Sequence, residues 1–281
     1  MLIDYRGALA DGARRLALTG VPDPDYDAGL LLYYATGVSR LTGMLDNKQL
    51  TGGQSDKYDR LLDKRAARIP LQYILGDVQF NGVTIRVDER ALIPRCETEL
   101  ICFNCEQYLR GRNDTPRILD LCTGSGAIAI ALKHALPNAD VFASDISVAA
   151  LSLARSNAEL NGVSIAFELG DLFEPWQGAA PFDMIVSNPP YVKSGEMPEL
   201  QLEVRREPAL ALDGGSDGLD FYRRIAAEAP QHLTVGGVLV LEVGMGQSDA
   251  VGALLEPRFE RLKIDEDFDD IPRMVWGFMD N

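Results

Sequence analysis

From Arg117 to Phe278, apolar segments of strand length alternate with segments of helical character. A helix between two strands normally lays the strands parallel, so this alternation predicts an α/β domain with helices on both faces of one sheet. An acidic turn at 267–270 separates the last two strands, which are expected to include an antiparallel edge strand. The predicted strands are Arg117–Leu121, Asp140–Ser144, Ser164–Leu169, Phe182–Ser187, Gly237–Val243, Glu260–Glu266 and Arg273–Phe278, and the predicted helices are 126–136, 147–161, 218–231 and 247–255.

The first 90 residues have a different character. Residues 1–70 contain clustered leucines and few β-branched runs, which predicts a small N-terminal helical domain. A helical domain of this size is too small to be a catalytic α/β domain, and we expect it to offer a surface for substrate recognition. Residues 71–90 predict a β-hairpin linker with Asn81–Gly82 at its turn, and residues 91–281 then form the catalytic domain. Within the helical part, we interpret Gly52–Gly53–Gln54 as a turn between helices.

A glycine-rich turn, Cys122–Thr123–Gly124–Ser125–Gly126, follows the first strand of the larger domain and leads into a helix. Its glycines let the backbone approach a ligand, and the helix N-terminus supplies N–H donors. Asp145 closes the next strand, about 20 positions after Gly124, where a carboxylate can accept ribose hydroxyls. The pattern predicts a cofactor with an adenosine-like part, but it does not separate NAD from S-adenosylmethionine.

A second acid, Asp171, follows the third strand of the same domain. At that place a carboxylate can meet the amino group of an adenine, and Leu172 can pack on the ring. An ordinary helix N-cap is the alternative role for Asp171.

The fourth strand ends in Asn188–Pro189–Pro190–Tyr191. The prolines restrict the backbone, so the stretch predicts a rigid elbow. The Asn188 side-chain oxygen and the Pro189 carbonyl can each accept one N–H of a planar amino group, and Tyr191 offers a flat face. In a doubly wound sheet the first and fourth strands are neighbours, so the elbow and the glycine turn should face one crevice.

Together these motifs resemble the class I S-adenosylmethionine-dependent methyltransferases, and in particular the HemK-type protein-(glutamine N5) methyltransferases. The resemblance implies a Rossmann-like, doubly wound seven-stranded sheet with a small N-terminal helical domain. It covers nearly the whole chain, with Cys96 replacing the usual proline and Cys122 the usual glycine. The shared stretches are Pro70–Gly76, Leu92–Glu99, Asp120–Gly126, Asn188–Tyr191, Arg206–Leu212 and Gly214–Leu219.

The resemblance implies methyl transfer from S-adenosylmethionine to the glutamine of the Gly-Gly-Gln motif in peptide chain release factors, with S-adenosylhomocysteine as product. A sister group modifies a ribosomal protein, and that substrate is the alternative. An N6-adenine methyltransferase and a non-catalytic cofactor-binding adaptor also stay open. The expected catalytic residues are Asn188, Pro189, Pro190 and Tyr191, and the expected cofactor-binding residues are Cys122, Thr123, Gly124, Ser125, Gly126, Asp145, Asp171, Leu172 and Asn188.

Three acidic or basic residues near the start of the larger domain, Arg95, Glu97 and Glu99, have two interpretations. They shape the rim of the crevice, or they form a salt-bridged helix N-terminus.

Composition restricts the partners and the location. The formal net charge of −15 opposes binding to a polyanion, so no nucleic-acid partner is expected. The sequence has no apolar run of about 18 residues and no signal peptide at its start, so a cytoplasmic protein without a membrane partner is expected. Cys102 and Cys105 form a lone C-x-x-C, and the two histidines are isolated, so free thiols and no metal site are expected.

Overall fold

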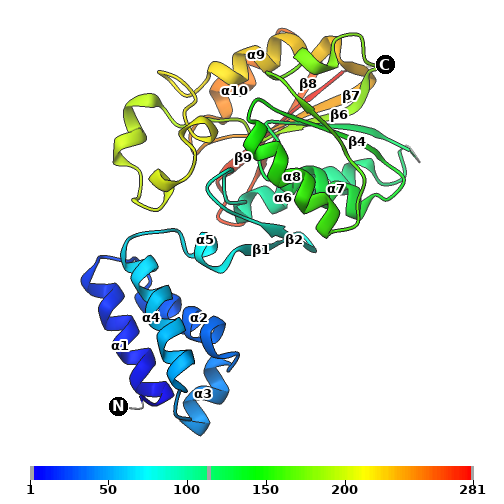
Figure 1. The fold of residues 1–281 in the computed structure, drawn as a ribbon. Helices are drawn as coiled ribbons and strands as arrows, with labels where there is room; N and C mark the ends of the chain where they lie inside the picture. Colours follow the sequence, from blue (N-terminus) through cyan, green and yellow to red (C-terminus); the bar gives the residue numbers. More distant parts are fainter. Residues whose placement is uncertain (1–2, 113–114, 280–281) are drawn as a thin grey trace. The chain divides into compact units, whose positions relative to one another are not determined.

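The computed structural model describes residues 3–112 and 115–279, and the chain divides into two compact units (Figure 1). The smaller unit runs to Gly76 and also contains Gln201–Arg206 from the second half of the chain. The larger unit comprises Asp77–Leu200 and the chain from Glu207 onward. A short piece of the loop after the Asn-Pro-Pro-Tyr elbow therefore belongs to the helical unit.

The smaller unit is helical, as the sequence predicts. Its first four helices each begin after a polar N-cap whose side chain accepts a backbone N–H, which satisfies a donor that a helix start leaves unpaired. Buried leucines and tyrosines from these helices form one core. The helices are α1 (Tyr5–Leu18), α2 (Pro24–Thr36), α3 (Arg40–Asp46), α4 (Gly52–Ala66) and the short α5 (Leu71–Leu75).

The prediction of an interhelical turn at Gly52–Gln54 is wrong, because these residues form the first turn of α4. The Thr51 hydroxyl accepts the Gln54 backbone N–H at 3.3 Å, and Gln54 Oε1 accepts the Thr51 backbone N–H at 3.0 Å. This capping box satisfies two backbone donors reciprocally and starts a helix where two glycines would otherwise disfavour one.

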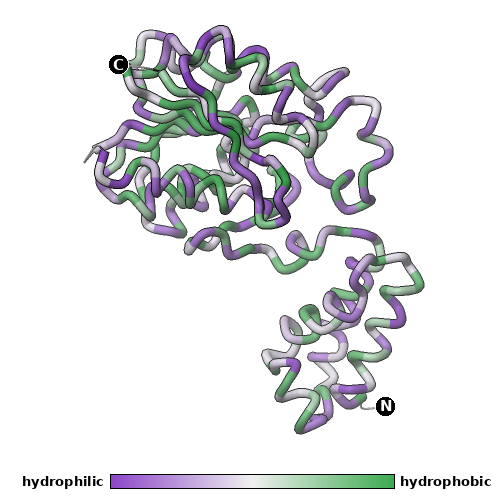
Figure 2. Tube along the Cα trace, turned by 180° about the vertical axis from the view of Figure 1, so that it is seen from behind, coloured by the Kyte–Doolittle hydropathy of each residue, from purple (hydrophilic) through white to green (hydrophobic). Residues whose placement is uncertain are grey.

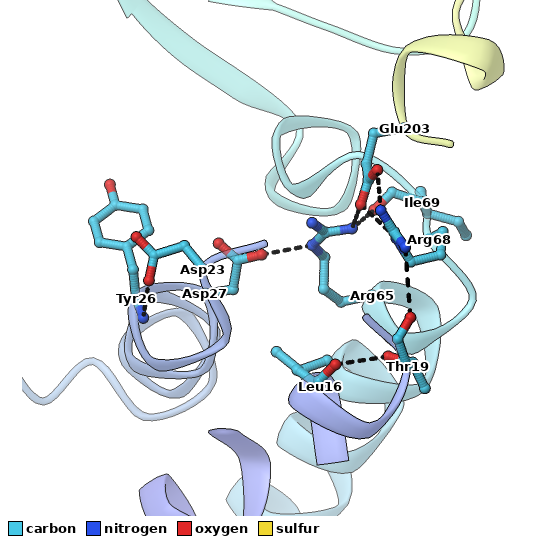
Figure 3. A network of polar contacts seen from close by, with 9 residues as sticks. All are labelled: Leu16, Thr19, Asp23, Tyr26, Asp27, Arg65, Arg68, Ile69 and Glu203. Atoms are coloured by element: carbon cyan, nitrogen blue, oxygen red, sulfur yellow. Dashed lines mark hydrogen bonds and ion pairs between the residues drawn. The ribbon is translucent and has the colours of Figure 1, made fainter. Parts of the chain in front are cut away.

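A charge network, with Arg65 and Asp27 buried and Arg68 and Glu203 half-buried, joins Gln201–Arg206 to the helices of the smaller unit (Figure 3). Arg65 of α4 donates to Asp27 of α2 at 2.6 Å and to Glu203 at 2.7 Å. Arg68 donates to both carboxylate oxygens of Glu203, at 2.7 and 2.6 Å. Although burial opposes ionisation, the hydrogen bonds from Arg68 and Arg65 lower the pKa of Glu203 to about 2. Burial raises the pKa of Asp27 in spite of its ion pair.

The larger unit contains a seven-stranded sheet in the order β5-β4-β3-β6-β7-β9-β8, which confirms the predicted doubly wound fold. The strands from β5 to β7 are parallel, whereas β9 runs antiparallel to both of its neighbours. The antiparallel strand is therefore an inner strand, not the edge strand that the sequence predicts. The strands are β3 (Arg117–Leu121), β4 (Asp140–Asp145), β5 (Ala166–Leu169), β6 (Phe182–Ser187), β7 (Leu233–Glu242), β8 (Arg261–Glu266) and β9 (Pro272–Phe278).

Helices cover both faces of this sheet (Figure 1). One face carries α6 (Cys96–Leu109), α7 (Ala127–Ala135) and α8 (Val148–Leu160), and the other carries α9 (Asp220–Glu228) and α10 (Ser248–Leu255). The central strands are the most hydrophobic part of the trace in Figure 2, as expected for strands buried on both faces. Every helix in residues 3–112 and 115–279 is too short or too polar to cross a membrane.

The hairpin of β1 (Asp77–Phe80) and β2 (Val83–Arg86), with Asn81–Gly82 at its turn, belongs to the larger unit. The carboxamide of Asn157 on α8 accepts the Arg86 N–H at 2.9 Å and donates to the carbonyls of Arg86 and Ser125 at 3.1 and 2.9 Å. One buried amide thus ties the hairpin to the glycine turn.

We expect Glu203→Gln to lower the free energy of unfolding of the helical unit by about 3 kcal/mol, because Arg68 would lose its ion pair and buried Arg65 would keep Asp27 as its charged partner but lose Glu203. Hydrogen exchange of the α4 amides measures the local opening, and Glu199→Gln, at an exposed glutamate nearby in sequence, is the control. Unchanged protection in Glu203→Gln would contradict the expectation.

The sign of the pH dependence follows from the lowered pKa. In the folded chain the pKa of Glu203 lies below its ordinary value of 4.5. The contribution of Glu203 to the free energy of unfolding is therefore complete above pH 4.5 and is lost as the pH falls toward about 2.

Candidate active site

Three strand ends meet at one edge of the sheet. Leu121 at the end of β3 lies opposite Ser187 of β6 on one side and Ser144 of β4 on the other. Because these strands are parallel, Cys122, Asp145 and Asn188 emerge at the same edge, as the sequence predicts.

A cavity lies at this edge, with about 860 Å³ of empty space when the open solvent at its mouth is counted. Seven of the predicted site residues line it: Cys122, Gly124, Asp145, Asp171, Leu172, Asn188 and Pro190. The lining residues that the sequence analysis missed come from five regions, namely Arg90–Leu92, Ser144 with Ile146, Ser147 and Ala150, Gly170, Pro208 with Leu210–Ala211, and Phe221 with Arg224 on α9. The stretches 92–99 and 206–212, quoted above for the family resemblance, were the available signal for several of them.

Five predicted residues, Thr123, Ser125, Gly126, Pro189 and Tyr191, are not among the residues that line this cavity. Thr123 and Gly126 instead shape the glycine turn. The Thr123 hydroxyl donates to buried Asp120 at 2.6 Å, and a Cβ on Gly126 would lie 3.0 Å from the Cβ of Ala154 on α8.

Asp120 is an acid within the apolar run 118–121, and the sequence analysis gave it no role. Its Oδ2 accepts the Thr123 hydroxyl and, at 3.2 Å, the Ala129 N–H at the start of α7. Burial raises the pKa of Asp120 to about 7, and these hydrogen bonds oppose the rise. The Asp120 side chain therefore links the glycine turn to the start of α7.

Two non-glycine residues in the cavity wall adopt left-handed backbone conformations. The φ angle is 58° at Cys122 and 51° at Leu172. Such a conformation costs a non-glycine residue on the order of 1–3 kcal/mol, which explains why a glycine suits position 122. Burial raises the pKa of the Cys122 thiol, so it stays protonated at neutral pH.

Asp145 connects the end of β4 to the glycine turn. Its Oδ2 accepts the Gly124 N–H and its Oδ1 accepts the Ser147 N–H, both at 2.8 Å. A carboxylate has about four acceptor positions, so Asp145 retains capacity for a ligand in the cavity. Burial raises its pKa while these backbone hydrogen bonds oppose the rise.

Asp171 does not act as a helix cap, because the short helix that follows it has no side-chain cap. Its carboxylate pairs with Arg224 of α9 at 2.8 Å, and both residues line the cavity. Buried Leu172, next in sequence, supplies an apolar part of the same wall.

The backbone of the elbow packs closely against two glycines, Gly214 and Gly218. A Cβ on Gly214 would lie 2.7 Å from the Cα of Tyr191, and a Cβ on Gly218 would lie 2.4 Å from the Tyr191 carbonyl oxygen. That carbonyl also accepts the side-chain amide of Gln247 at 3.0 Å. Gly214 and Gly218 are therefore required by the close approach of the elbow.

The Asn188 carboxamide has a buried polar partner. Its Nδ2 donates to the Thr98 hydroxyl at 3.3 Å, and that hydroxyl donates to Glu242 Oε2 at 2.7 Å. Burial raises the pKa of Glu242 to about 7, with the Thr98 hydrogen bond opposing the rise. The sequence signal for Glu242 was an acid at the end of the apolar run 238–241, and it was missed.

The Arg95 guanidinium pairs with Glu207 at 2.5 Å, and the other Glu207 oxygen accepts the Ile93 N–H at 2.9 Å. This contact joins the stretches 92–99 and 206–212. Glu97 and Glu99 lie in the first turn of α6, where the helix dipole favours acids. None of Arg95, Glu97 and Glu99 is among the cavity-lining residues.

The described residues contain no group of three or more His, Cys, Asp or Glu side chains that could hold a metal ion. Cys102 and Cys105 are free thiols buried on α6.

We expect Gly214→Ala to lower the free energy of unfolding by about 1–3 kcal/mol, because the added methyl group would collide with the backbone of the elbow. Gly195→Ala is the matched control, since a Cβ there has no atom within 4 Å. Thermal denaturation of both variants tests this, and equal melting temperatures would refute the proposed role of Gly214.

Comparisons with known proteins agree with this architecture. The PrmC N-terminal domain family matches residues 7–76, and the Methyltransferase small domain family matches residues 107–206. A methyltransferase from Pyrococcus furiosus shares the fold, with a TM-score of 0.54 at 20% identity over 71% of this chain and 90% of that one.

Two curated relatives are similar over most of the chain. A release factor glutamine methyltransferase from Deinococcus radiodurans is 42% identical over 255 residues, which is 90% of both chains. The enzyme of the same name from Geobacter sulfurreducens is 42% identical over 266 residues, 93% of this chain and 92% of its own. The chain therefore belongs to the release factor glutamine methyltransferase family.

Proposed function

We propose that this chain transfers a methyl group from S-adenosylmethionine to the side-chain amide nitrogen of the glutamine in the Gly-Gly-Gln motif of peptide chain release factors. The observation that carries the proposal is the Asn188 carboxamide at the wall of a cavity built from the glycine turn and Asp145. The relatives named release factor glutamine methyltransferase support the choice of a protein substrate and of its glutamine.

The walls of the cavity suit S-adenosylmethionine in their chemistry. Asp145 keeps free acceptor positions for ribose hydroxyls, while Asp171 and Leu172 offer a carboxylate and an apolar surface for an adenine. The turn Cys122–Gly126 would hold the methionine part, with Cys122 and Gly124 in the cavity wall. When bound, S-adenosylmethionine supplies an electrophilic methyl group on a sulfonium.

The elbow orients the acceptor amide. An amide nitrogen is a poor nucleophile because its lone pair is delocalised, so its position must be set closely. Asn188 Oδ1 and the Pro189 carbonyl accept the two N–H groups of the glutamine side chain. They also stabilise the positive charge that develops on the nitrogen, an interaction stronger in the transition state than in the ground state.

The proton of the methylated amide can leave to water, so no strong base is needed. Burial raises the pKa of Tyr191 to about 12, so its hydroxyl is neutral at physiological pH. The ring of Tyr191 serves to position the planar amide.

The helical unit docks the protein substrate. Leu41 and Leu45 of α3 and Tyr26 and Tyr33 of α2 are exposed although they are large and apolar. Such side chains are available to a protein partner. Contacts made far from the reacting atoms can offset the entropy lost when a flexible Gly-Gly-Gln loop is ordered, about 1–2 kcal/mol per residue.

We expect the purified chain, incubated with isotopically labelled S-adenosylmethionine, to place one methyl group on the Gly-Gly-Gln glutamine of a release factor. Peptide mass spectrometry locates the label, and a release factor with that glutamine replaced by alanine should stay unlabelled. Label on a ribosomal protein or on DNA, with none on the release factor, would refute the proposal.

We expect Asn188→Ala to remove most of the methyl transfer and to leave S-adenosylmethionine affinity nearly unchanged. The lost hydrogen bond to the developing charge is worth about 1.5–3 kcal/mol, or about ten- to a hundredfold in kcat. Single-turnover kinetics and calorimetry measure the two quantities. A variant with near-normal kcat would mean that the elbow is only a turn.

Asp145→Asn provides the complementary control. The substitution should weaken S-adenosylmethionine binding, because an NH2 donor replaces one acceptor oxygen of the carboxylate. NAD should bind neither the wild-type chain nor the variant. Since Asp145 also accepts the Gly124 N–H, the melting temperature must be measured beside the affinity.

A further inference from the structure

The Asn188 carboxamide ends a hydrogen-bonded chain that no part of the proposed chemistry has used. Asn188 follows β6, Thr98 lies in the first turn of α6, and Glu242 ends β7. Thr98 and Glu242 are 4% and 3% exposed, so water does not compete freely for their polar atoms. Neither residue is among those that line the cavity.

The order of donors along this chain determines which way the carboxamide faces. The Thr98 hydroxyl has one hydrogen, and it is donated at 2.7 Å to Oε2 of the ionised Glu242, which can only accept. The hydroxyl oxygen can then only accept, and it accepts the Asn188 Nδ2–H at 3.3 Å. With its NH2 end held on Thr98, the carboxamide has its oxygen end free for another donor.

The opposite orientation would disable the elbow. A carboxamide rotated by a half turn would place its oxygen against an oxygen with no spare hydrogen and its NH2 group toward the acceptor amide. Two NH2 groups cannot hydrogen-bond to one another usefully, since each is a donor.

We infer that Thr98, held by Glu242, is a positioning residue that keeps the Asn188 oxygen directed at the substrate amide. The inference rests on the proposed function, in which Asn188 accepts an N–H of the glutamine. It predicts that the Thr98 hydroxyl matters for turnover although Thr98 does not line the cavity.

The end of β7 is built to hold Glu242 in place. The Tyr222 hydroxyl of α9 donates to the Glu242 backbone carbonyl at 2.9 Å. Charges from Glu97, Arg273 and Arg95 act on the carboxyl group, and none of them is hydrogen-bonded to it. The Thr98 hydroxyl is thus the direct hydrogen-bonding contact of this side chain.

The test compares Thr98→Val, which has the shape of threonine without the hydroxyl, with Thr98→Ser, which keeps it. We expect Thr98→Val to lower kcat about tenfold, the worth of one hydrogen bond, with cofactor affinity unchanged. Thr98→Ser should recover most of the wild-type kcat. Thr234→Val, at the opposite end of the sheet near Asp183, controls for the loss of a threonine hydroxyl elsewhere.

A second readout does not depend on methyl transfer. In protein labelled with 15N at asparagine side chains, the Asn188 NH2 signal is identified by its absence from Asn188→Ala. One of its protons should exchange slowly with water in wild type and Thr98→Ser, and rapidly in Thr98→Val. Thr98→Ala gives the same comparison if valine prevents folding.

The outcomes distinguish the positioning role of Thr98 from the proposed substrate. Wild-type kcat in Thr98→Val, equal losses in the serine and valine variants, or unchanged exchange of the Asn188 protons would overturn the positioning role. Absence of methyl transfer by the wild-type chain, together with the expected exchange pattern, would reject the proposed substrate and retain the orientation of Asn188 by Thr98.

Discussion

The parallel pairing of β3 with β6 is the constraint on which the site depends. It places the glycine turn after Leu121 next to the elbow after Ser187, although about 65 residues separate them in sequence. A cofactor cavity and an amide-holding elbow can share one crevice only because both strands end at the same level. The buried apolar surface of these strands stabilises that register, since a shift by one residue would turn every side chain to the other face.

Buried polar groups then give the crevice its detailed shape. Asp120 and Asp145 accept hydrogen bonds from the glycine turn, and Asp145 thereby connects that turn to β4. Asn157 donates to the turn and connects it to the hairpin. Each of these side chains satisfies backbone or hydroxyl donors that would be costly to leave unpaired in the interior. The same side chains therefore contribute to stability and set the form of the cavity wall.

The loop after the elbow connects the site with the helical unit through the chain itself. Glu203 is held by Arg65 and Arg68 within the helical unit, and Glu207, four positions later, is held by Arg95 within the larger one. Pro208, which follows directly, lines the cavity. The segment that bears a cavity residue is thus anchored by ion pairs on both sides of the unit boundary.

The sequence alone determined the class of the fold, the order of its strands and helices, and the motifs at the strand ends. Strand and helix periodicity and the glycine and proline signals are local, so they are readable without coordinates. The adjacency of the glycine turn and the elbow also followed, because doubly wound sheets place their first and fourth strands together.

Only the tertiary structure decided which distant side chains meet. The contact of Thr98 with Glu242 joins residues far apart in sequence, and nothing local distinguishes that threonine from one on a helix surface. The close approach of Gly214 to Tyr191 and the inner place of β9 depend in the same way on packing between elements. Gly52–Gln54 was misjudged because glycines suggest a turn locally, whereas a reciprocal cap from Thr51 makes them a helix start.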